Sequence, residues 1–408
     1  MLFHHRGHRG HRAGAEIGKG QLSDPNPFFL SDLCVLCALC GEKASQMVSK
    51  VIDSQRRVLV AMSGGVDSSV TAGLLRDAGF AVTGVFMCLG TAGDPDSDSR
   101  GCCSPQDAAD ARAVAHKLGI ELYVLNLADA FQPIIEYFVD EYRHGRTPNP
   151  CIPCNAQIKF GRLIGHADSL GIPWVATGHY ARIAPVGGRL AIFRKSPRHK
   201  DQSYVLFGIA RELLGRILLP LGDMPSKENV RAKARVMSLP VHDKPDSQEI
   251  CFVPDNDYVA YLSRRCPETL QPGPIVDSGG KVLGRHRGIA AFTVGQRKGL
   301  GVAGKIPLFV THLDAATATI TVGPRSEILH RHLRATQANW HCDLPEEFEA
   351  TVQVRYNHAG SPGRVRVTGA AAFEVDFAEP VMAVTPGQAA VCYDGDRLLG
   401  GGWIQSAS

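Results

Sequence analysis

Apolar residues in the first half of the chain fall in strand-length runs that alternate with stretches of helical spacing. A continuous apolar run of strand length lies at residues 58–62, and runs rich in apolar residues at 81–87 and 122–127 also indicate strands. Helical spacing of apolar positions begins after residue 65 and recurs over 108–118. Strands that alternate with helices predict an α/β domain with a doubly wound parallel sheet, in which ligands bind at the carboxyl ends of the strands.

The pattern changes after Tyr258, where one short helical segment gives way to short β-rich runs separated by glycine turns. Alternating apolar and polar residues then dominate the end of the chain. We therefore predict an α/β domain over 51–255, a small β-rich domain over 256–325 and a C-terminal Greek-key β-barrel over 326–408.

Residues 1–50 have no apolar periodicity and include the basic, low-complexity stretch HHRGHRGHR. Such a segment cannot bury a core, so we expect it to be disordered. Cys34, Cys37 and Cys40 have the spacing of metal ligands. No fourth ligand is obvious, however, and the apolar residues between them favour a buried segment.

Composition sets few limits on function. The chain has 408 residues, enough for two or three domains, and 44% of them are hydrophobic. A net charge of +4 permits an RNA partner without requiring one. No apolar stretch approaches the roughly 20 residues that a membrane helix needs, so we expect a soluble cytoplasmic protein with no membrane partner.

The first strand runs into the sequence SGGVDSS, residues 63–69, before the first helix. Adjacent glycines let the backbone approach an anion closely, while serine hydroxyls and the N–H groups at the helix start supply hydrogen-bond donors. The stretch lacks the Gly-Lys-Ser/Thr ending of a Walker loop and the spacing of the dinucleotide fingerprint. It resembles the pyrophosphate loop of the ATP pyrophosphatases, which cut ATP to AMP and pyrophosphate.

This resemblance implies an ATP site in which Mg²⁺ neutralises the pyrophosphate and is held in part by Asp67. Met87 ends its strand at the ligand-binding edge of the sheet and can line the adenine pocket, although a buried core methionine is the commoner role for such a residue. The implied ATP-binding residues of these two strand ends are Ala61, Met62, Ser63, Gly64, Gly65, Val66, Asp67, Ser68 and Met87.

Three cysteines stand in settings that suit reactive thiols. Cys151 and Cys154 have CxxC spacing in a proline-rich loop before an expected helix start, where the helix dipole and Lys159 favour a thiolate. Cys251 lies in an apolar stretch, residues 250–253, where a buried small hydrophobic residue is the alternative role. In a reducing compartment such cysteines are more often catalytic or metal-binding than paired in a structural disulfide.

Five motifs together resemble the tRNA-specific 2-thiouridylase family: SGGVDSS, GRTPNPCIPCNAQIKF, ATGHYARI, KDQSYVLF and DSQEICFVP, in that order over residues 58–405. In that family ATP adenylates the wobble uridine of tRNA, and an enzyme persulfide then supplies sulfur. The resemblance implies that Cys154 is the nucleophile and that Cys251 carries the persulfide. It also implies that Gly178 contacts the nucleotide and that Asp67 belongs to the catalytic set.

The implied partners are tRNAs with a wobble uridine, those for glutamate, glutamine and lysine, and a sulfur-donor protein, either a cysteine desulfurase or a relay protein. Without the surrounding motif, His179 would be interpreted as a core histidine satisfied by hydrogen bonds. The implied tRNA-binding residues are Asn149, Pro150, Cys151, His179, Lys200, Asp201, Gln202, Arg355, Tyr356 and Gln388.

One position departs from the commoner family pattern. Many members have aspartate three residues before the nucleophile, where this chain has Cys151. Three thiolates, Cys151, Cys154 and Cys251, are the number that holds a [4Fe-4S] cluster with one open iron site. Persulfide relay and cluster-bound sulfide both remain open. A third thiolate beside a nucleophile favours the cluster, because an unoccupied one invites a dead-end disulfide.

Two rival functions come from other classes. Another ATP pyrophosphatase, such as a tRNA lysidine synthase or an amidotransferase, would activate a carbonyl for an amine, but it would not need three thiols. A non-catalytic RNA-binding or sulfur-carrier protein would not need an intact nucleotide loop. The combination of loop and thiols therefore favours ATP-dependent sulfur transfer to tRNA.

Overall fold

The computed structural model describes residues 56–90, 104–195, 198, 200–246, 250–253 and 257–408. The predictions for residues 1–50, including those for Cys34, Cys37 and Cys40, lie outside the described residues.

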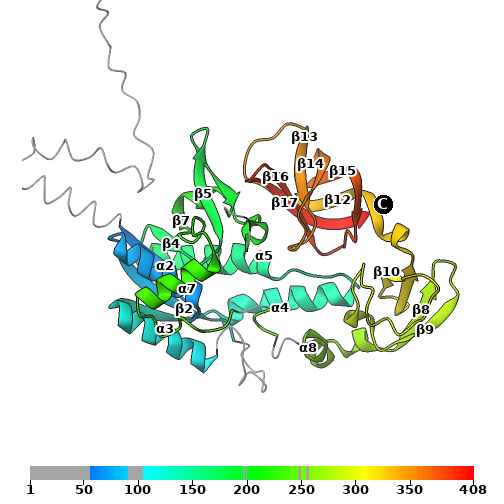
Figure 1. The fold of residues 1–408 in the computed structure, drawn as a ribbon, viewed down its shortest axis with the longest axis horizontal. Coiled ribbons are helices and arrows are strands. Elements are labelled where there is room, and N and C mark those ends of the chain that lie inside the picture. The colour runs from blue at the N-terminus through cyan, green and yellow to red at the C-terminus, as the bar shows by residue number, and fades with distance from the viewer. Residues whose placement is uncertain (1–55, 91–103, 196–197, 199, 247–249, 254–256) are drawn as a thin grey trace, which may run out of the picture. The chain divides into compact units, whose positions relative to one another are not determined.

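A parallel sheet forms the centre of the first domain (Figure 1). Its strands are β1 (Arg57–Ala61), β2 (Ala81–Cys88), β3 (Glu121–Asn126), β4 (Trp174–Ala176) and β7 (Ile217–Leu218), in the order β3-β2-β1-β4-β7. The chain runs from β1 outward to β2 and β3 and later returns to place β4 on the other side of β1. The strand order therefore reverses beside β1, which is where doubly wound sheets bind ligands. The predicted fold class is confirmed.

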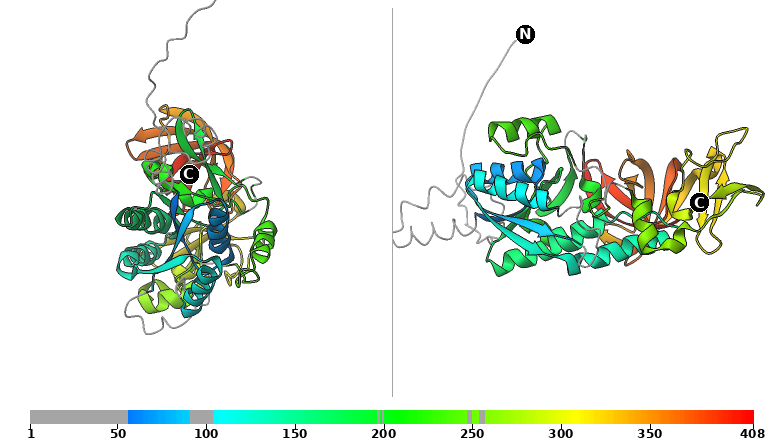
Figure 2. Two further views of the ribbon diagram at one scale, coloured as in Figure 1. Left: turned by 90° about the vertical axis from the view of Figure 1, so that its left-hand side faces the viewer. Right: turned by 90° about the horizontal axis from the view of Figure 1, so that it is seen from below.

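Helices cover both faces of this sheet (Figure 2). The α-helices α2 (Val66–Asp77), α3 (Pro105–Leu118) and α7 (Lys227–Val236) pack on one face, and the π-helix η2 (Cys154–Arg162) and α6 (Leu163–Ser169) pack on the other. Val58 and Val60 of β1 join the core of the first group, while Leu59 and Ala61 join that of the second. This alternation follows from the period of two in a strand and explains why β1 reads as a continuous apolar run.

The middle of the chain forms a separate small sheet after helix α8 (Tyr258–Arg265). Its strands are β8 (Gly273–Asp277), β9 (Val282–His286), β10 (Phe309–Asp314) and β11 (Thr319–Gly323), in the order β10-β11-β8-β9. Ile275, Val310, Ile320 and Val322 form the centre of its core. The predicted β-rich character of this stretch is confirmed.

The C-terminal strands close into a barrel. They are β12 (Leu329–Trp340), β13 (Glu347–Gln353), β14 (Ser361–Gly369), β15 (Ala372–Met382), β16 (Ala389–Asp394) and β17 (Arg397–Ala407). All the pairings within the barrel are antiparallel, and β12 pairs with both β15 and β17, which closes the ring. The predicted C-terminal barrel is confirmed.

A hairpin that the sequence interpretation did not resolve links the first domain to this barrel. It consists of β5 (Ala181–Val186) and β6 (Arg189–Arg194), and Phe193 of β6 pairs with Arg397 of β17. Tyr204 and Phe207 from the first domain and Val391 from β16 belong to one apolar cluster. The barrel therefore shares a core with the catalytic domain.

Two buried histidines should make the fold sensitive to acid. Burial lowers the pKa of His179 and of His341 below the ordinary value of 6.5. As pH falls through 6.5 the unfolded chain binds protons that the folded chain does not, so the free energy of unfolding should decrease by up to about 1.4 kcal/mol per pH unit for each histidine. Urea titrations at pH 7, 6 and 5 measure this slope. The variant His341→Gln should flatten it, and equal slopes in the two proteins would contradict the prediction.

Candidate active site

The SGGVDSS loop joins β1 to α2 in a conformation that depends on Gly64. Gly64 has φ +71°, and a Cβ built there would lie 2.3 Å from the carbonyl oxygen of Asp107. The Ser63 N–H donates to the Ser68 hydroxyl at 3.2 Å, which folds the loop over the helix start. Gly65 is the N-cap of α2 and supplies no side-chain cap. The first N–H groups of α2 therefore remain able to bind an anion such as pyrophosphate.

We expect Gly64→Ala to abolish nucleotide binding. The added methyl group would collide with the Asp107 carbonyl, and alanine disfavours a positive φ, so the loop must shift. Gly165→Ala is a suitable control because Gly165 lies in α6 with no atom near the position of a new Cβ. Isothermal titration with ATP compares the two variants. Unchanged affinity in Gly64→Ala would exclude this loop as the nucleotide site.

Asp67 in the first turn of α2 is held by two side chains. The Tyr180 hydroxyl and the Lys227 ammonium both donate to Oδ1 of Asp67, each at 2.7 Å. Oδ2 has no hydrogen bond to the residues that the structure describes, and the side chain is 32% exposed. A carboxylate with one fixed and one available oxygen suits Mg²⁺, which takes oxygen ligands.

Lys227 belongs to a chain of charges that leads away from the nucleotide loop. Its side chain is 6% exposed, and its ammonium lies 3.0 Å from Asp246 as well as against Asp67. Asp246 also pairs with Arg231 at 2.8 Å and with Lys200. Although burial would raise it, hydrogen bonds from Lys200 and Lys227 lower the pKa of Asp246 to about 2. Asp246 is therefore ionised at neutral pH and bridges three cations.

The sequence interpretation missed Tyr180, Lys227 and Asp246. One signal was available for Lys227, because this lysine shares the buried face of α7 with Val230 and Ala234. A lysine on the buried face of a helix is rare unless it is paired. Its closest carboxylate partner, Asp67, is however 160 positions away in the sequence.

Lys244 braces the nucleotide loop from its outer side. Its ammonium donates to the Gly64 carbonyl at 3.1 Å, to Asp107 at 2.6 Å and to Asp110 at 2.5 Å. These bonds tie the start of α3 to the turn between β1 and α2. Three bonds from one side chain therefore support the conformation of this loop.

Gly178 and His179 follow β4 and pack against the same loop. A Cβ on Gly178 would lie 2.9 Å from backbone atoms of Asp67 and Ser68, so only glycine allows this close approach. His179 is buried, and its Nδ1 lies 2.7 Å from the Thr177 hydroxyl. The ring of Phe160 on η2 lies 5.9 Å from that of His179. The segment that carries Cys154 thus reaches the nucleotide loop through His179.

The three predicted thiols have different environments. Cys151 begins the short helix α5 (Cys151–Pro153) and is exposed, while Cys154 is the first residue of the π-helix η2 and is buried. Cys154 and the half-buried Cys251 pack against one apolar cluster that includes Phe131 and Phe138. Cys151 is not part of this cluster. π-Helical segments are frequent at functional sites, and the sequence pattern does not predict them.

The placement of these thiols does not support a shared iron–sulfur site. Among the residues that the structure describes, which include all three thiols, no group of three or more Cys, His, Asp or Glu side chains is placed to hold a metal. The structure therefore adds no support for the cluster inferred from sequence, and Cys151, three residues before Cys154, is the exposed one of the three thiols.

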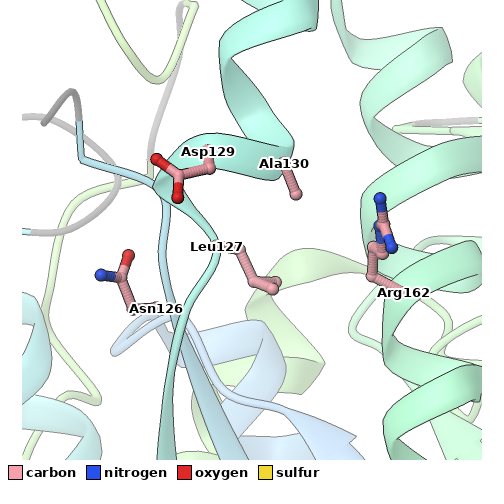
Figure 3. Close-up of a pocket in the computed structure, with 5 residues that line it drawn as sticks. All are labelled: Asn126, Leu127, Asp129, Ala130 and Arg162. Carbon is pink, nitrogen blue, oxygen red and sulfur yellow. The ribbon is translucent and has the colours of Figure 1, made fainter.

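A polar pocket opens at the carboxyl end of β3 (Figure 3). Its volume is about 340 Å³, and its lining residues are Asn126, Leu127, Asp129, Ala130 and Arg162. Asn126 ends β3, Asp129 lies in the first turn of α4 (Ala128–Arg143), and Arg162 ends η2. The pocket lies at the edge of the sheet where doubly wound folds bind ligands. The sequence interpretation did not single out any of its residues.

Comparison with known proteins adds the family. Relatives named tRNA-specific 2-thiouridylase MnmA include those of Carboxydothermus hydrogenoformans, 48% identical over 361 residues covering 86% of this chain and 98% of that one, and Rhodopirellula baltica, 46% identical over 386 residues covering 86% and 96%. The Sorangium cellulosum relative is 44% identical, covering 87% of this chain and 93% of that one. The chain belongs to the tRNA-specific 2-thiouridylase family.

Family models match the three domains of this 2-thiouridylase family member in turn. They are described as a tRNA methyl transferase HUP domain at residues 56–255, a tRNA methyl transferase PRC-barrel domain at 260–324 and an aminomethyltransferase beta-barrel domain at 330–404. The first is the nucleotide-binding type of fold, which agrees with ATP binding. None of the helices in the described parts of the chain is long and apolar enough to cross a membrane.

The residues that the resemblance to 2-thiouridylases implies to bind tRNA differ in exposure. Lys200 has a positive φ of 61° and a 39% exposed side chain. Its neighbours turn inward: Asp201 accepts from the Lys195 N–H at 2.9 Å, and Gln202 accepts from the Tyr180 N–H at 2.9 Å. Asp201 and Gln202 therefore hold the loop that presents Lys200.

The barrel residues of the proposed tRNA surface lie close to the loop of residues 146–153 that leads into Cys154, here called the cysteine loop. Tyr356 is 39% exposed, and burial together with the charges of Asp201 and Cys151 raises its pKa. Gln388 donates to the Thr147 carbonyl at 2.8 Å. Arg355 is half-buried in the turn after β13.

Hydrogen bonds fix the backbone of the cysteine loop near both of its ends. The Thr147 N–H donates to the Pro386 carbonyl of the barrel at 3.1 Å. Asn149 accepts from the Cys151 N–H at 3.2 Å, and Pro150 is buried. Gln388 therefore supports this loop from the barrel side, whether or not it also contacts RNA.

Proposed function

We propose that the protein is a tRNA-uridine 2-sulfurtransferase that adenylates the C2 oxygen of the wobble uridine and then replaces that oxygen with sulfur. The observation that carries the proposal is the joint presence, within one α/β domain, of a pyrophosphate-type loop and of two thiols against a shared apolar cluster. A carbonyl oxygen is a poor leaving group, so ATP is needed to convert it to one.

In the first step, the uridine O2 attacks the α-phosphorus of ATP, and pyrophosphate leaves. The N–H groups at the start of α2 and the Ser63 side chain bind the pyrophosphate, and Lys227 and Tyr180 orient Asp67. Mg²⁺ bound at Oδ2 of Asp67 would neutralise charge on the leaving group. Met87, half-buried at the end of β2, lines the side of the site where adenine would lie.

In the second step, the terminal sulfur of a Cys251 persulfide attacks C2, and AMP leaves with the original oxygen. The Cys154 thiolate then attacks Sγ of Cys251, which breaks the sulfur–sulfur bond to the transferred atom and forms a Cys154–Cys251 disulfide. A thiol reductant must restore both cysteines. Cys154 and Cys251 pack against the same apolar side chains, and this supports a relay between these two thiols.

The finer assignments follow from the family resemblance. We propose that the substrates are the glutamate, glutamine and lysine tRNAs, that a cysteine desulfurase or a relay protein delivers the persulfide sulfur, and that the reaction takes place in the cytoplasm. Lys200, Arg355, Tyr356 and His179 are proposed to lie on the tRNA side of the site. His179, being buried, would act there by supporting the loop around Gly178.

The test is a reconstitution with unmodified tRNA, ATP, Mg²⁺ and a persulfide donor. The proposal predicts pyrophosphate release that depends on tRNA and 2-thiouridine in the digested nucleosides. An amide-forming pyrophosphatase would release pyrophosphate without forming 2-thiouridine, and a non-catalytic RNA-binding protein would release none. Either result would overturn the proposal.

A further inference from the structure

The tRNA-facing loop and the nucleotide loop are joined by an unbroken series of ion pairs. Lys200 pairs with Asp246, Asp246 with Lys227, and Lys227 with Asp67. The exposed fraction of the side chain falls from 39% at Lys200 to 21% at Asp246 and 6% at Lys227. The series thus begins at the surface and ends at the carboxylate beside the pyrophosphate site.

We propose that Asp246 is a positioning residue that couples tRNA binding at Lys200 to the availability of Asp67 for the metal–nucleotide complex. This inference rests on the proposed function, because it takes a tRNA phosphate as the partner of Lys200 and ATP with Mg²⁺ as the ligand beside Asp67.

The charges determine the direction of the coupling. Arg231 and Lys227 contact Oδ1 of Asp246, while Lys200 alone contacts Oδ2. When an RNA phosphate draws Lys200 away, Asp246 loses a cation and attracts Lys227 more strongly. Lys227 has its closest contact with Asp67 at 2.7 Å and a second contact with Asp246 at 3.0 Å, so a small movement shifts it from one carboxylate to the other. Oδ1 of Asp67 then keeps only its hydrogen bond from Tyr180, and the carboxylate is more available to Mg²⁺.

The backbone at Lys200 supplies a second observation. Its φ of 61° places a non-glycine residue in the left-handed region, which costs free energy unless the surroundings impose it. The Asp201 and Gln202 side chains fix this turn by their bonds to backbone N–H groups on both sides. Lys200 is therefore presented in one defined direction, between Asp246 and the surface.

The experiment measures the affinity of the full chain for an unmodified wobble-uridine tRNA with and without Mg²⁺ and α,β-methylene-ATP, which cannot release pyrophosphate. Coupling between two sites is reciprocal, so the nucleotide should tighten tRNA binding about fivefold or more. In Asp246→Asn the ratio of the two affinities should approach one. In Lys200→Met it should also approach one, with weaker tRNA binding overall.

Arg198→Gln is the matched control. Arg198 lies on the same loop as Lys200 but pairs with Asp396 at 2.8 Å instead of Asp246. In Arg198→Gln, the nucleotide should tighten tRNA binding by the same factor as in the wild-type protein. The coupling is overturned if the nucleotide does not change the tRNA affinity of the wild-type protein. It is also overturned if a folded Asp246→Asn or Lys200→Met protein shows the same nucleotide effect as the wild type. In either case, 2-thiouridine formation still supports the proposed function. Absence of tRNA binding and of 2-thiouridine overturns both.

Discussion

Replacing Lys227 with methionine is expected to reduce tRNA-dependent pyrophosphate release by about 100- to 1000-fold, the range seen when a preorganised charged donor is lost from an active site. Lys227 is the buried cation that fixes Oδ1 of Asp67 and balances Asp246. Without it, Asp67 and Asp246 lose the cation that they share, and only Tyr180 still holds Asp67. Single-turnover measurement of pyrophosphate at saturating ATP tests the effect.

The same substitution should also lower the stability of the protein, by about 1–3 kcal/mol, because Asp67 loses its hydrogen bond from a charged partner while Asp246 keeps Lys200 and Arg231. Adding Asp67→Asn to Lys227→Met should recover part of the stability but none of the pyrophosphate release. Lys233→Met is the matched control on the same helix, since Lys233 has no ion pair among the described residues. Full activity of a folded Lys227→Met protein would contradict the role assigned to the pair.

The second large effect concerns the thiols. Cys154→Ala and Cys251→Ala should each abolish 2-thiouridine formation, because the relay needs one cysteine to carry sulfur and another to release it. Both variants should retain tRNA-dependent pyrophosphate release, since adenylation precedes sulfur transfer. Nucleoside analysis by mass spectrometry, combined with pyrophosphate measurement, separates the two steps.

Cys151→Asp distinguishes the relay from an iron–sulfur mechanism. Cys151 is exposed and lies outside the cluster that Cys154 and Cys251 share, so aspartate should preserve thiolation. Iron determination and absorbance of anaerobically purified protein provide the control. An iron-containing wild-type enzyme that loses both iron and thiolation in Cys151→Asp would show that the three thiolates act together.

The sequence predicted those parts of the fold that depend on local patterns. The run at 58–62, the glycine loop and the helix after it appear as β1, a turn with Gly64 at positive φ, and α2, because period and turn chemistry act over a few residues. The closed barrel followed equally from alternation. The site was predicted only in part. Its loop and thiols lie in recognisable motifs, whereas the Lys227–Asp67 pair joins residues 160 positions apart.

Long-range contacts of this kind leave almost no local signal. In the sequence, Asp246 cannot be told from an ordinary charged residue of an exposed turn. Only the folded structure places three cations beside it. Likewise, β5 and β6 form an ordinary hairpin in sequence, and their pairing with β17 depends on the position of the barrel. The π-helical start at Cys154 is a matter of hydrogen-bond register, which residue types do not specify.

The bond from Gln388 to Thr147 has a consequence for dividing this enzyme into parts. The barrel holds the backbone of the cysteine loop through this bond. The two backbones also lie very close together, because a Cβ at Gly387 would lie 3.0 Å from the Thr147 backbone nitrogen. A fragment that ends before β12 would therefore lack a support for its own chemistry as well as an RNA surface. Inactivity of such a fragment could not be ascribed to weaker substrate binding, and homologous barrels could be exchanged between family members only together with the loop that they support.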